Sequence, residues 1–354
     1  MKSFNLKFLE MSTWLESTRK PNFNNLLKIM EHGRPDRPTL FEFFLYEGLY
    51  KRLAGVNEDK VQTGLEWWIT AIKAYTNAGY DYTTILGSDF GFSSNRHQEK
   101  KTISLNDGAV IFDRESYKRY PWPDPDSFDA SRLDTLAPEL PEGMKFIVWG
   151  PGGVLENVIA LTGYDNLCYL MLDDPGLVQD LFDEVGSRLV RYYEICSGYK
   201  PVGALISNDD WGFNTQTMLS ASDLRKYVFP WHKKIVNTIH AAGKPAILHS
   251  CGQLEHVMDD IIDDMKYDAK HSYEDNILPV EQAYARWGEK IAIFGGIDLD
   301  FLCRSTPEAI YRRSCSMLET TSVKGCYALG SGNSIPYFIP DENYLAMISS
   351  VRQS

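Results

Sequence analysis

Two residues of the sequence, His249 and Cys251, have the side chains and the spacing of a metal site. They stand at the end of a predicted strand, where residues two positions apart point the same way, so both can face one ion. Imidazole and thiolate together suit zinc better than a hard cation. Zinc with an open coordination position could bind a thiol substrate and hold it as thiolate. The alternative is a buried core histidine beside an inert cysteine, and a metal site needs a third ligand from elsewhere.

Adjacent carboxylates follow another predicted strand, in the sequence Asn208-Asp209-Asp210-Trp211. Such a pair is costly to bury unless it is paired, metal-bound or protonated. Asp209 and Asp210 could therefore be acid–base groups or hydrogen-bond a substrate, or one of them could cap the following segment. Asp89, which follows an earlier predicted strand, has the same two interpretations.

A scaffold must position these residues, and the chain shows a rhythm of strands followed by helices. Alternating strands and helices imply a parallel sheet, and eight such units favour a closed (β/α)8 TIM barrel over an open Rossmann sheet. No Gly-x-Gly-x-x-Gly follows the first strand, which counts against a dinucleotide fold. We predict a single barrel domain over residues 1–354. The predicted strands are Arg37–Phe44, Asp81–Leu86, Lys145–Trp149, Val202–Ser207, Pro245–Ser250, Tyr267–Ser272, Ile291–Gly296 and Cys326–Gly330.

Two segments interrupt this rhythm. Residues 1–24 precede the first strand and are predicted to form a helical extension across the bottom of the barrel. Residues 90–140 are long and rich in proline, and Thr102–Asp113 predicts a β-hairpin around Asn106-Asp107-Gly108. An insertion of this length after the second strand would lie on the catalytic face. The pattern also predicts where helices begin, as at Thr306-Pro307-Glu308, where threonine precedes proline and an acid.

Functional groups of barrel enzymes gather at the carboxyl ends of the strands. The first such end offers Glu42, which we predict to be catalytic together with Asp89 and Asp210. The sixth offers His271, with Glu274 beyond it. Other positions at strand ends are candidates for binding the substrate, namely Asn208, Asp209, Trp211, Gly150, Ser331 and Asn333.

Composition and charge restrict the class of protein. The hydrophobic fraction of 44% is ordinary for a globular protein, and the formal net charge of -12 argues against nucleic acid and anionic membranes as main partners. No apolar run approaches the ~20 residues of a membrane helix, and the N-terminus lacks the long apolar stretch of a secretory signal. The six cysteines are scattered, so we expect reduced thiols and a cytoplasmic protein.

Taken in order, the motifs at the strand ends resemble those of the uroporphyrinogen decarboxylase superfamily, over about residues 21 to 353. Each motif is weak alone, but the whole set in register is specific at the level of the superfamily. The resemblance implies a barrel with its active site at the carboxyl ends of the strands. The motifs are Pro35-Asp36-Arg37-Pro38, Ser88-Asp89, Gly150-Pro151, Asp210-Trp211-Gly212, Ser220–Pro230, His249-Ser250-Cys251-Gly252, Gly295-Gly296-Ile297-Asp298, and Leu329-Gly330-Ser331-Gly332 with Pro336 and Pro340-Asp341-Glu342-Asn343.

One branch of this superfamily, the true decarboxylases, removes acetate carboxyls from uroporphyrinogen without a cofactor. Its members use an arginine-rich loop after the first strand, an aspartate that matches Asp89, and a histidine on the last loop. In this chain the first-strand segment carries its basic residues late, at Lys51 and Arg52, and Ser331 occupies the position of the late histidine. A polycarboxylate substrate would find too few positive partners here, so the chain is less similar to this branch.

The other branch consists of zinc-dependent methyltransferases that work with corrinoid proteins. They are similar to this chain in carrying His-x-Cys-Gly after the fifth strand, which implies that His249 and Cys251 are zinc ligands. Their usual third ligand is a cysteine on the loop after the eighth strand, and the loop Gly330–Pro336 has none. Candidates for the third ligand are Glu42, Asp209, His271 and Glu274.

Three functions remain open. The first is a zinc-dependent methyltransferase that moves a methyl group between a corrinoid carrier protein and a small substrate, with Glu42 and Asp210 positioning the substrate. The second is a cofactor-free decarboxylase of a carboxylated substrate, with Asp89 stabilising a protonated intermediate. The third is a binding protein that has lost catalysis, because the third cysteine and the arginine loop are both missing. A homodimer is an open alternative to a monomer.

Overall fold

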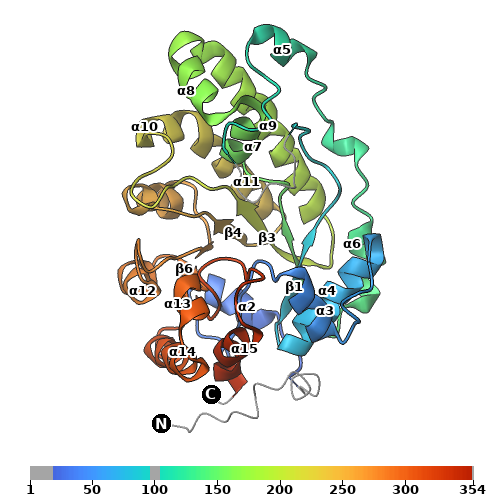
Figure 1. The fold of residues 1–354 in the computed structure, drawn as a ribbon, viewed down its shortest axis with the longest axis vertical. Helices are drawn as coiled ribbons and strands as arrows, with labels where there is room; N and C mark the ends of the chain where they lie inside the picture. Colours follow the sequence, from blue (N-terminus) through green and yellow to red (C-terminus); the bar gives the residue numbers. More distant parts are fainter. Residues whose placement is uncertain (1–18, 96–103, 353–354) are drawn as a thin grey trace.

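The computed structural model describes residues 19–95 and 104–352, and their centre is a parallel β-sheet (Figure 1). The sheet has seven strands in the order β1 to β7, each hydrogen-bonded to the next along the chain. The α/β class and the parallel sheet predicted from the sequence are therefore confirmed. Each observed strand falls within a predicted one, apart from one residue at the end of β3. The strands are β1 Tyr82–Leu86, β2 Lys145–Trp149, β3 Val202–Asn208, β4 Ala246–His249, β5 Ala269–His271, β6 Ala292–Phe294 and β7 Tyr327–Ala328.

The register of the sheet aligns the carboxyl ends of neighbouring strands. Asn208, the last residue of β3, pairs with His249 at the end of β4, and His249 pairs with His271 at the end of β5. His271 in turn pairs with Phe294 of β6. Because parallel strands share one direction, this register brings polar residues that are distant in sequence to one edge of the sheet.

The first predicted strand, Arg37–Phe44, departs from the prediction. It forms one isolated parallel bridge, between Leu40 and Leu329 just after β7, and a bend at Phe43 interrupts it before a second bridge between Leu45 and Ile335. The predicted count of eight strands is therefore corrected to seven strands and one bridging segment. The bend is the physical reason, because it breaks the extended backbone that continuous strand pairing requires.

Side-chain hydroxyl groups complete the contact between this segment and β1. Tyr82 accepts a hydrogen bond from the N–H of Glu42 and donates one to its C=O, each at 2.6 Å. Thr84 of β1 and Tyr75 of α4 (Gly64–Ala78) donate to the C=O of Phe43 at 2.9 and 3.0 Å. Buried backbone groups need partners, so these hydroxyls substitute for strand pairing and fix the position of Glu42.

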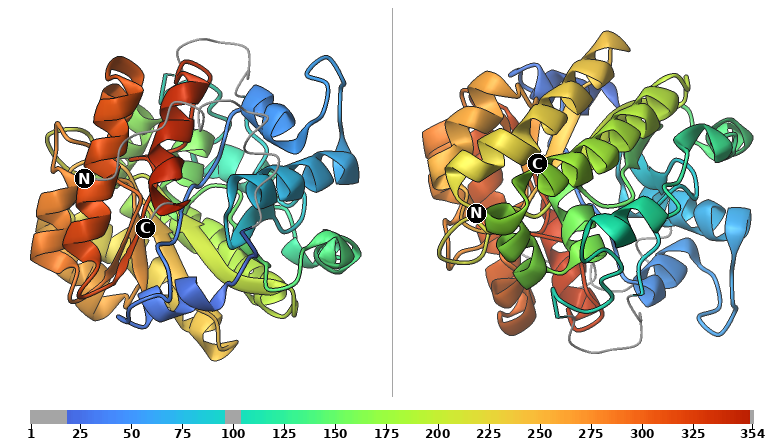
Figure 2. Two further views of the ribbon diagram at one scale, coloured as in Figure 1. Left: turned by 90° about the horizontal axis from the view of Figure 1, so that it is seen from below. Right: turned by 90° about the horizontal axis from the view of Figure 1, so that it is seen from above.

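Helices surround the sheet, as the views from below and above show (Figure 2). Asp174 caps α9 by accepting from the N–H of Leu177, and Thr306 caps α14 through the N–H of Ala309, which confirms the helix start predicted there. No helix of the described residues is both long and apolar enough to cross a bilayer. The helices are α2 Asn24–Met30, α3 Glu47–Ala54, α4, α5 Arg114–Arg119, α6 Arg132–Thr135, α7 Val154–Thr162, α8 Tyr164–Asp173, α9 Pro175–Ser197, α10 Ala221–Asp223, α11 Phe229–Ala241, α12 Val280–Trp287, α13 Leu299–Arg304, α14 Pro307–Thr321 and α15 Asp341–Ser349.

The two irregular segments predicted from the sequence fall partly outside the described residues. Most of the helical extension expected over residues 1–24 lies there, as does the start of the predicted hairpin. The turn at Asn106-Asp107-Gly108 is present, but the described part of the hairpin contains no strand. Val110 and Ile111 donate instead to the C=O of Leu161 at the end of α7, at 2.8 and 2.9 Å. Their N–H groups therefore cap a helix.

We expect Tyr82→Phe to lower the free energy of unfolding by about 1–3 kcal/mol, because it leaves the buried N–H of Glu42 without its partner. Urea unfolding followed by circular dichroism measures the change. The control is Tyr169→Phe, which removes a hydroxyl from a residue that is 67% exposed and should stay within about 0.5 kcal/mol of the wild type. Equal free energies of unfolding for the two variants would contradict the role of Tyr82 in bonding the backbone of Glu42.

Candidate metal centre

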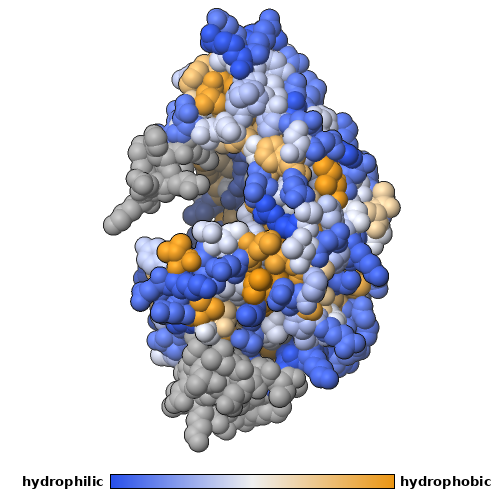
Figure 3. Space-filling model, turned by 90° about the vertical axis from the view of Figure 1, so that its right-hand side faces the viewer, coloured by the Kyte–Doolittle hydropathy of each residue, from blue (hydrophilic) through white to orange (hydrophobic). Residues whose placement is uncertain are grey.

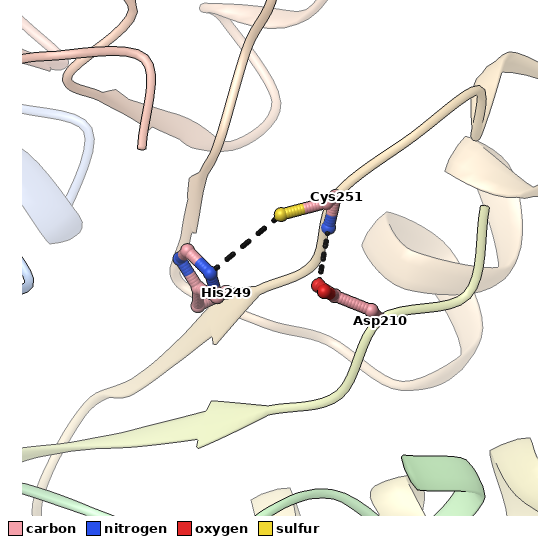
Figure 4. A group of neighbouring side chains, drawn as sticks. All are labelled: Asp210, His249 and Cys251. Carbon is pink, nitrogen blue, oxygen red and sulfur yellow. Dashed lines mark hydrogen bonds between the residues drawn. The ribbon is translucent and has the colours of Figure 1, made fainter. Parts of the chain in front are cut away.

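Three donor atoms of kinds that bind metals converge at the carboxyl ends of β3 and β4 (Figure 4). Asp210 follows β3, and His249 and Cys251 stand at the end of β4. One carboxylate oxygen, one imidazole nitrogen and the sulfur lie within 4.8 Å of one another. The sulfur of Cys251 is 3.8 Å from Nε2 of His249, and the N–H of Cys251 donates to Oδ1 of Asp210 at 2.9 Å. The sequence pair is therefore brought together, and Asp210 joins it.

The distance between the sulfur of Cys251 and Nε2 of His249 is compatible with a small tetrahedral ion. With Zn–S of about 2.3 Å and Zn–N of about 2.0 Å, a tetrahedral angle separates sulfur from nitrogen by roughly 3.5 Å. The observed 3.8 Å between Cys251 and His249 is close to that value. Imidazole, thiolate and carboxylate are all zinc ligands, and three of them leave a coordination position for a substrate. The donor set therefore suits zinc. The third donor is Asp210, which was not among the four residues considered for that position from the sequence, Glu42, Asp209, His271 and Glu274.

A cation at this cluster would have to bind the deprotonated forms of Cys251 and Asp210. Burial raises the pKa of Cys251 well above its ordinary value, and the nearby Asp210 carboxylate adds to this effect. Burial raises the pKa of Asp210 as well. A divalent cation offsets both effects, because it stabilises the deprotonated forms of its ligands.

Close contact between two loops places Cys251 beside Asp210. Gly252 has a φ of +91°, in the left-handed region that favours glycine. A Cβ at Gly252 would lie 2.2 Å from the C=O of Gly212, and a Cβ at Gly212 would lie 2.7 Å from the backbone nitrogen of Gln253. The glycines of Asp-Trp-Gly and Ser-Cys-Gly are therefore both needed for the loops after β3 and β4 to touch.

Two further side chains donate hydrogen bonds to the sulfur of Cys251. The hydroxyl of Ser272 lies at 3.3 Å and Nδ2 of Asn333 at 3.1 Å. Ser272 has a φ of +82°, a strained conformation for a residue other than glycine, and Nζ of Lys270 holds its C=O at 2.7 Å. Asn333, a predicted substrate-binding residue, is thus placed against the donor cluster.

His271, predicted to be a metal ligand, lies beside the cluster without belonging to it. Its Nδ1 is 2.8 Å from Nδ1 of His249, and its Nε2 is 3.3 Å from the C=O of Ser331. This corrects the prediction, because both ring nitrogens already have partners. Burial lowers the pKa of both imidazoles, that of His271 to about 3, so both rings are neutral near pH 7.

Glu42 lies at the far end of this line of contacts. Its carboxyl group accepts from the N–H of Ser331 at 2.6 Å and from the hydroxyl of Ser331 at 2.7 Å. The side chain is fully buried, and burial raises its pKa to about 8. Glu42 and Ser331, predicted to act on and to bind the substrate, are therefore partners in one buried network. Among the described residues, the donor atoms that come together are those of Asp210, His249 and Cys251, and Glu42 is not one of them.

The adjacent aspartates have different surroundings. Asp209 is completely buried, and its carboxylate accepts from the N–H groups of Leu155 and Glu156 in the first turn of α7, both at 2.9 Å. Its Oδ2 is also 2.8 Å from Nε2 of His232. This corrects two predictions, since Asp209 anchors a helix and is neither a substrate-binding residue nor the third ligand. Asp210 alone of the pair faces the cluster.

Three other predicted substrate-binding positions have partners within the protein. Trp211 is fully buried against the ring of Phe229, which corrects its prediction because no surface of the indole is left for a ligand. Oδ1 of Asn208 accepts from the N–H of Gly150 at 3.1 Å. A Cβ at Gly150 would lie 2.3 Å from the hydroxyl of Tyr193, so packing accounts for this glycine.

Asp89 is not brought to the cluster. Its side chain is 79% exposed and pairs with Arg132 at 2.5 Å. The chain after β1 thus directs this carboxylate toward solvent and a guanidinium group, which corrects its predicted place in a shared site. Glu274 is half-buried, and burial, Asp298 and then Asp210 raise its pKa.

Two residues near the cluster were not predicted from the sequence. Ser272 comes directly after the last residue of β5, and that position was its signal. Glu156 accepts from the N–H groups of Gly153, at 2.8 Å, and of Asp210, and burial raises its pKa to about 8. Its signal was an acidic residue in the first turn of a helix, where it can reach back to the capping N–H.

Comparisons with known proteins agree with this architecture. The family described as uroporphyrinogen decarboxylase (URO-D) matches residues 129–354. Among solved structures, a methyltransferase from Methanosarcina mazei is similar with a TM-score of 0.68 and 14% identity, over 93% of this chain and 97% of that chain. A 3-keto-D-glucoside 4-epimerase from E. coli has a TM-score of 0.41 and 12% identity, over 90% and 98% of the two chains. No curated protein sequence matches. At 14% identity the likeness to the methyltransferase concerns the fold alone.

The adjacent aspartates offer a matched pair of variants. We expect Asp209→Asn to lower the free energy of unfolding by about 3 kcal/mol, because an amide cannot accept from both helix N–H groups and His232. Asp210→Asn should stay within about 1 kcal/mol of the wild type and weaken zinc binding instead. Urea unfolding and competition with a chromophoric zinc chelator measure the two effects. The reverse pattern would contradict the assignment.

Glu42 should make stability decrease as pH rises. Its pKa in the folded protein is about 8, above the ordinary 4.5, so between these values the folded chain binds more protons than the unfolded chain. The free energy of unfolding of the metal-free protein should fall from about pH 5 to about pH 8, and Glu42→Gln should flatten that fall. Urea unfolding across this range tests the expectation, and identical slopes for wild type and variant would refute it.

Proposed function

Because the chain belongs to the uroporphyrinogen decarboxylase family, we propose that it is a zinc-dependent methyltransferase, which moves a methyl group between a corrinoid carrier and a small substrate. The observation that carries the proposal is the convergence of Asp210, His249 and Cys251 within 4.8 Å of one another. The fold shared with the methyltransferase from Methanosarcina mazei is compatible with this function.

In this proposal Asp210, His249 and Cys251 hold the zinc ion. Zinc bound there would act as a Lewis acid and keep a coordinated substrate group, such as a thiol, deprotonated near neutral pH. Ser272 and Asn333 orient the sulfur of Cys251 through their hydrogen bonds. Asp210 thus changes from a residue expected to position the substrate to a ligand.

One face of the molecule is hollowed between its upper and lower parts (Figure 3), and small molecules commonly bind in such concave surfaces. Asn208, Gly150, Ser331 and Asn333 stay candidates for contacts with the substrate because they lie at or after strand ends. A corrinoid carrier would dock over the carboxyl ends of the strands, where the metal ligands lie.

A cofactor-free decarboxylase is the alternative, and two contacts speak against it. The carboxylate of Asp89, which would stabilise a protonated intermediate, is 79% exposed and paired with Arg132. The buried ammonium group of Lys270 is bonded to three backbone C=O groups, at 2.7 to 3.4 Å. It is therefore not available to a substrate carboxylate. Turnover of a carboxylic acid by the metal-free protein would favour this alternative.

Zinc content tests the proposal directly. We expect the wild-type protein to bind about one zinc ion and Cys251→Ala to lose it while remaining folded, since the thiol is the one soft ligand of the set. Cys303→Ala is the matched control, because it makes the same change at a cysteine that is not among the three donors. Metal analysis after dialysis against zinc gives the stoichiometry, and circular dichroism reports folding.

Methyl transfer from methylcobalamin to a panel of small thiols, followed by absorbance, tests the reaction itself. Activity that depends on zinc and on Cys251, but not on Cys303, supports the methyltransferase. Equal zinc content in all three proteins would remove its chemical basis. Zinc binding and ligand retention without any turnover would favour a binding protein that has lost catalysis.

A further inference from the structure

A line of buried polar contacts leads from His249 across the carboxyl ends of the strands. Nδ1 of His249 lies 2.8 Å from Nδ1 of His271 on the neighbouring strand β5. Nε2 of His271 lies 3.3 Å from the C=O of Ser331, and Glu42 holds Ser331 through both its N–H and its hydroxyl. All four residues are buried, so solvent offers them no alternative partners.

The far end of this line determines where the protons lie. A backbone C=O can only accept, so Nε2 of His271 must carry a hydrogen. A neutral imidazole has one N–H, which leaves Nδ1 of His271 with a lone pair. The facing Nδ1 of His249 must then donate. Nε2 of His249 is left unprotonated, 3.8 Å from the sulfur of Cys251.

We propose that His271 is a positioning residue: by accepting the Nδ1–H of His249 it fixes the tautomer and orientation of that ring, so that Nε2 is available to a metal ion. Histidines that bind metals commonly donate their second N–H to a carboxylate, a C=O or water. Here the acceptor is Nδ1 of a second imidazole, that of His271. This nitrogen is free to accept because the C=O of Ser331 holds the hydrogen of His271 on Nε2. The inference rests on the proposed function only in that a metal ion binds at His249. The assignment of the protons concerns the metal-free protein and does not depend on that function.

The carbonyl group that directs this assignment is itself held in place. The C=O of Ser331 accepts from the N–H of Gly296 at 2.8 Å as well as from His271. Gly295, with a φ of +70°, leaves room for this contact, because a Cβ there would lie 2.2 Å from the oxygen of Ser331 and 2.9 Å from Nε2 of His271. With Glu42 on the other side, Ser331 has no freedom to offer a donor instead.

A purely structural role for His271 is the alternative, since its ring packs edge-on against Phe41 with the centroids 4.9 Å apart. Two substitutions separate the roles. His271→Asn keeps an acceptor near the position of Nδ1 and loses the ring, whereas His271→Phe keeps the shape of the ring and loses the acceptor. If His271 acts only through packing, His271→Phe should affect zinc binding less than His271→Asn does. If His271 positions His249, His271→Asn should affect it less.

Zinc affinity is measured by competition with a chromophoric chelator. The tautomer of His249 is measured in the metal-free protein by long-range proton–nitrogen correlation NMR. We expect wild-type His249 to be protonated on Nδ1 and unprotonated on Nε2. His271→Phe should weaken zinc binding by about 10- to 100-fold and remove the preference for this tautomer, whereas His271→Asn should bind zinc within about threefold of the wild type.

Wild-type His249 protonated on Nε2 would overturn the proposal, and so would His271→Phe that binds zinc more tightly than His271→Asn. Should His271→Phe not fold, the wild-type tautomer and the affinity of His271→Asn still decide. Failure of the proposed function is seen separately. A wild-type protein that transfers no methyl group but carries the Nδ1 proton on His249 refutes the methyltransferase and leaves the positioning role intact.

Discussion

The hydrogen bond between the imidazoles of His249 and His271 is the contact on which the arrangement of the site depends. Two buried, neutral rings whose Nδ1 atoms lie 2.8 Å apart need one donor and one acceptor, so each must be fixed by a group on its far side. Ser331 does this for His271, and the sulfur of Cys251 lies on the far side of His249. Since the two histidines pair in register on β4 and β5, the sheet itself sets this distance.

The need of buried polar groups for partners also explains how the sheet continues past β7 without a regular eighth strand. The backbone of Glu42 is bonded by the hydroxyl of Tyr82, and its side chain by Ser331. One residue thus joins the start of the sheet, at β1, to the loop after its last strand. A charged carboxylate would be costly in this buried place. The raised pKa of Glu42 lets the group be neutral between β1 and the loop after β7.

The parts that could be predicted from the sequence are those that local pattern decides. The bounds of β2 and the shared direction of His249 and Cys251 follow from residues that are neighbours in the chain. The third donor could not be predicted, because the direction of Asp210 depends on the contact between Gly212 and Gly252, which stand on different loops. The exposed position of Asp89 and the bend that ends the first predicted strand likewise depend on tertiary contacts that no short window contains.

The loop after β7 shows how the site can keep its shape with a different donor. In the methyltransferases that the sequence resembles, this loop supplies a cysteine ligand, whereas here Asn333 reaches the sulfur of Cys251 with an N–H at 3.1 Å. An N–H group cannot coordinate a cation, so in the proposed zinc site the second negative charge would come from Asp210. A carboxylate is a harder ligand than a thiolate, and a sulfur that accepts hydrogen bonds from Ser272 and Asn333 donates less charge to a metal. Both differences act in one direction, toward a harder and more Lewis-acidic site than one built on two cysteines.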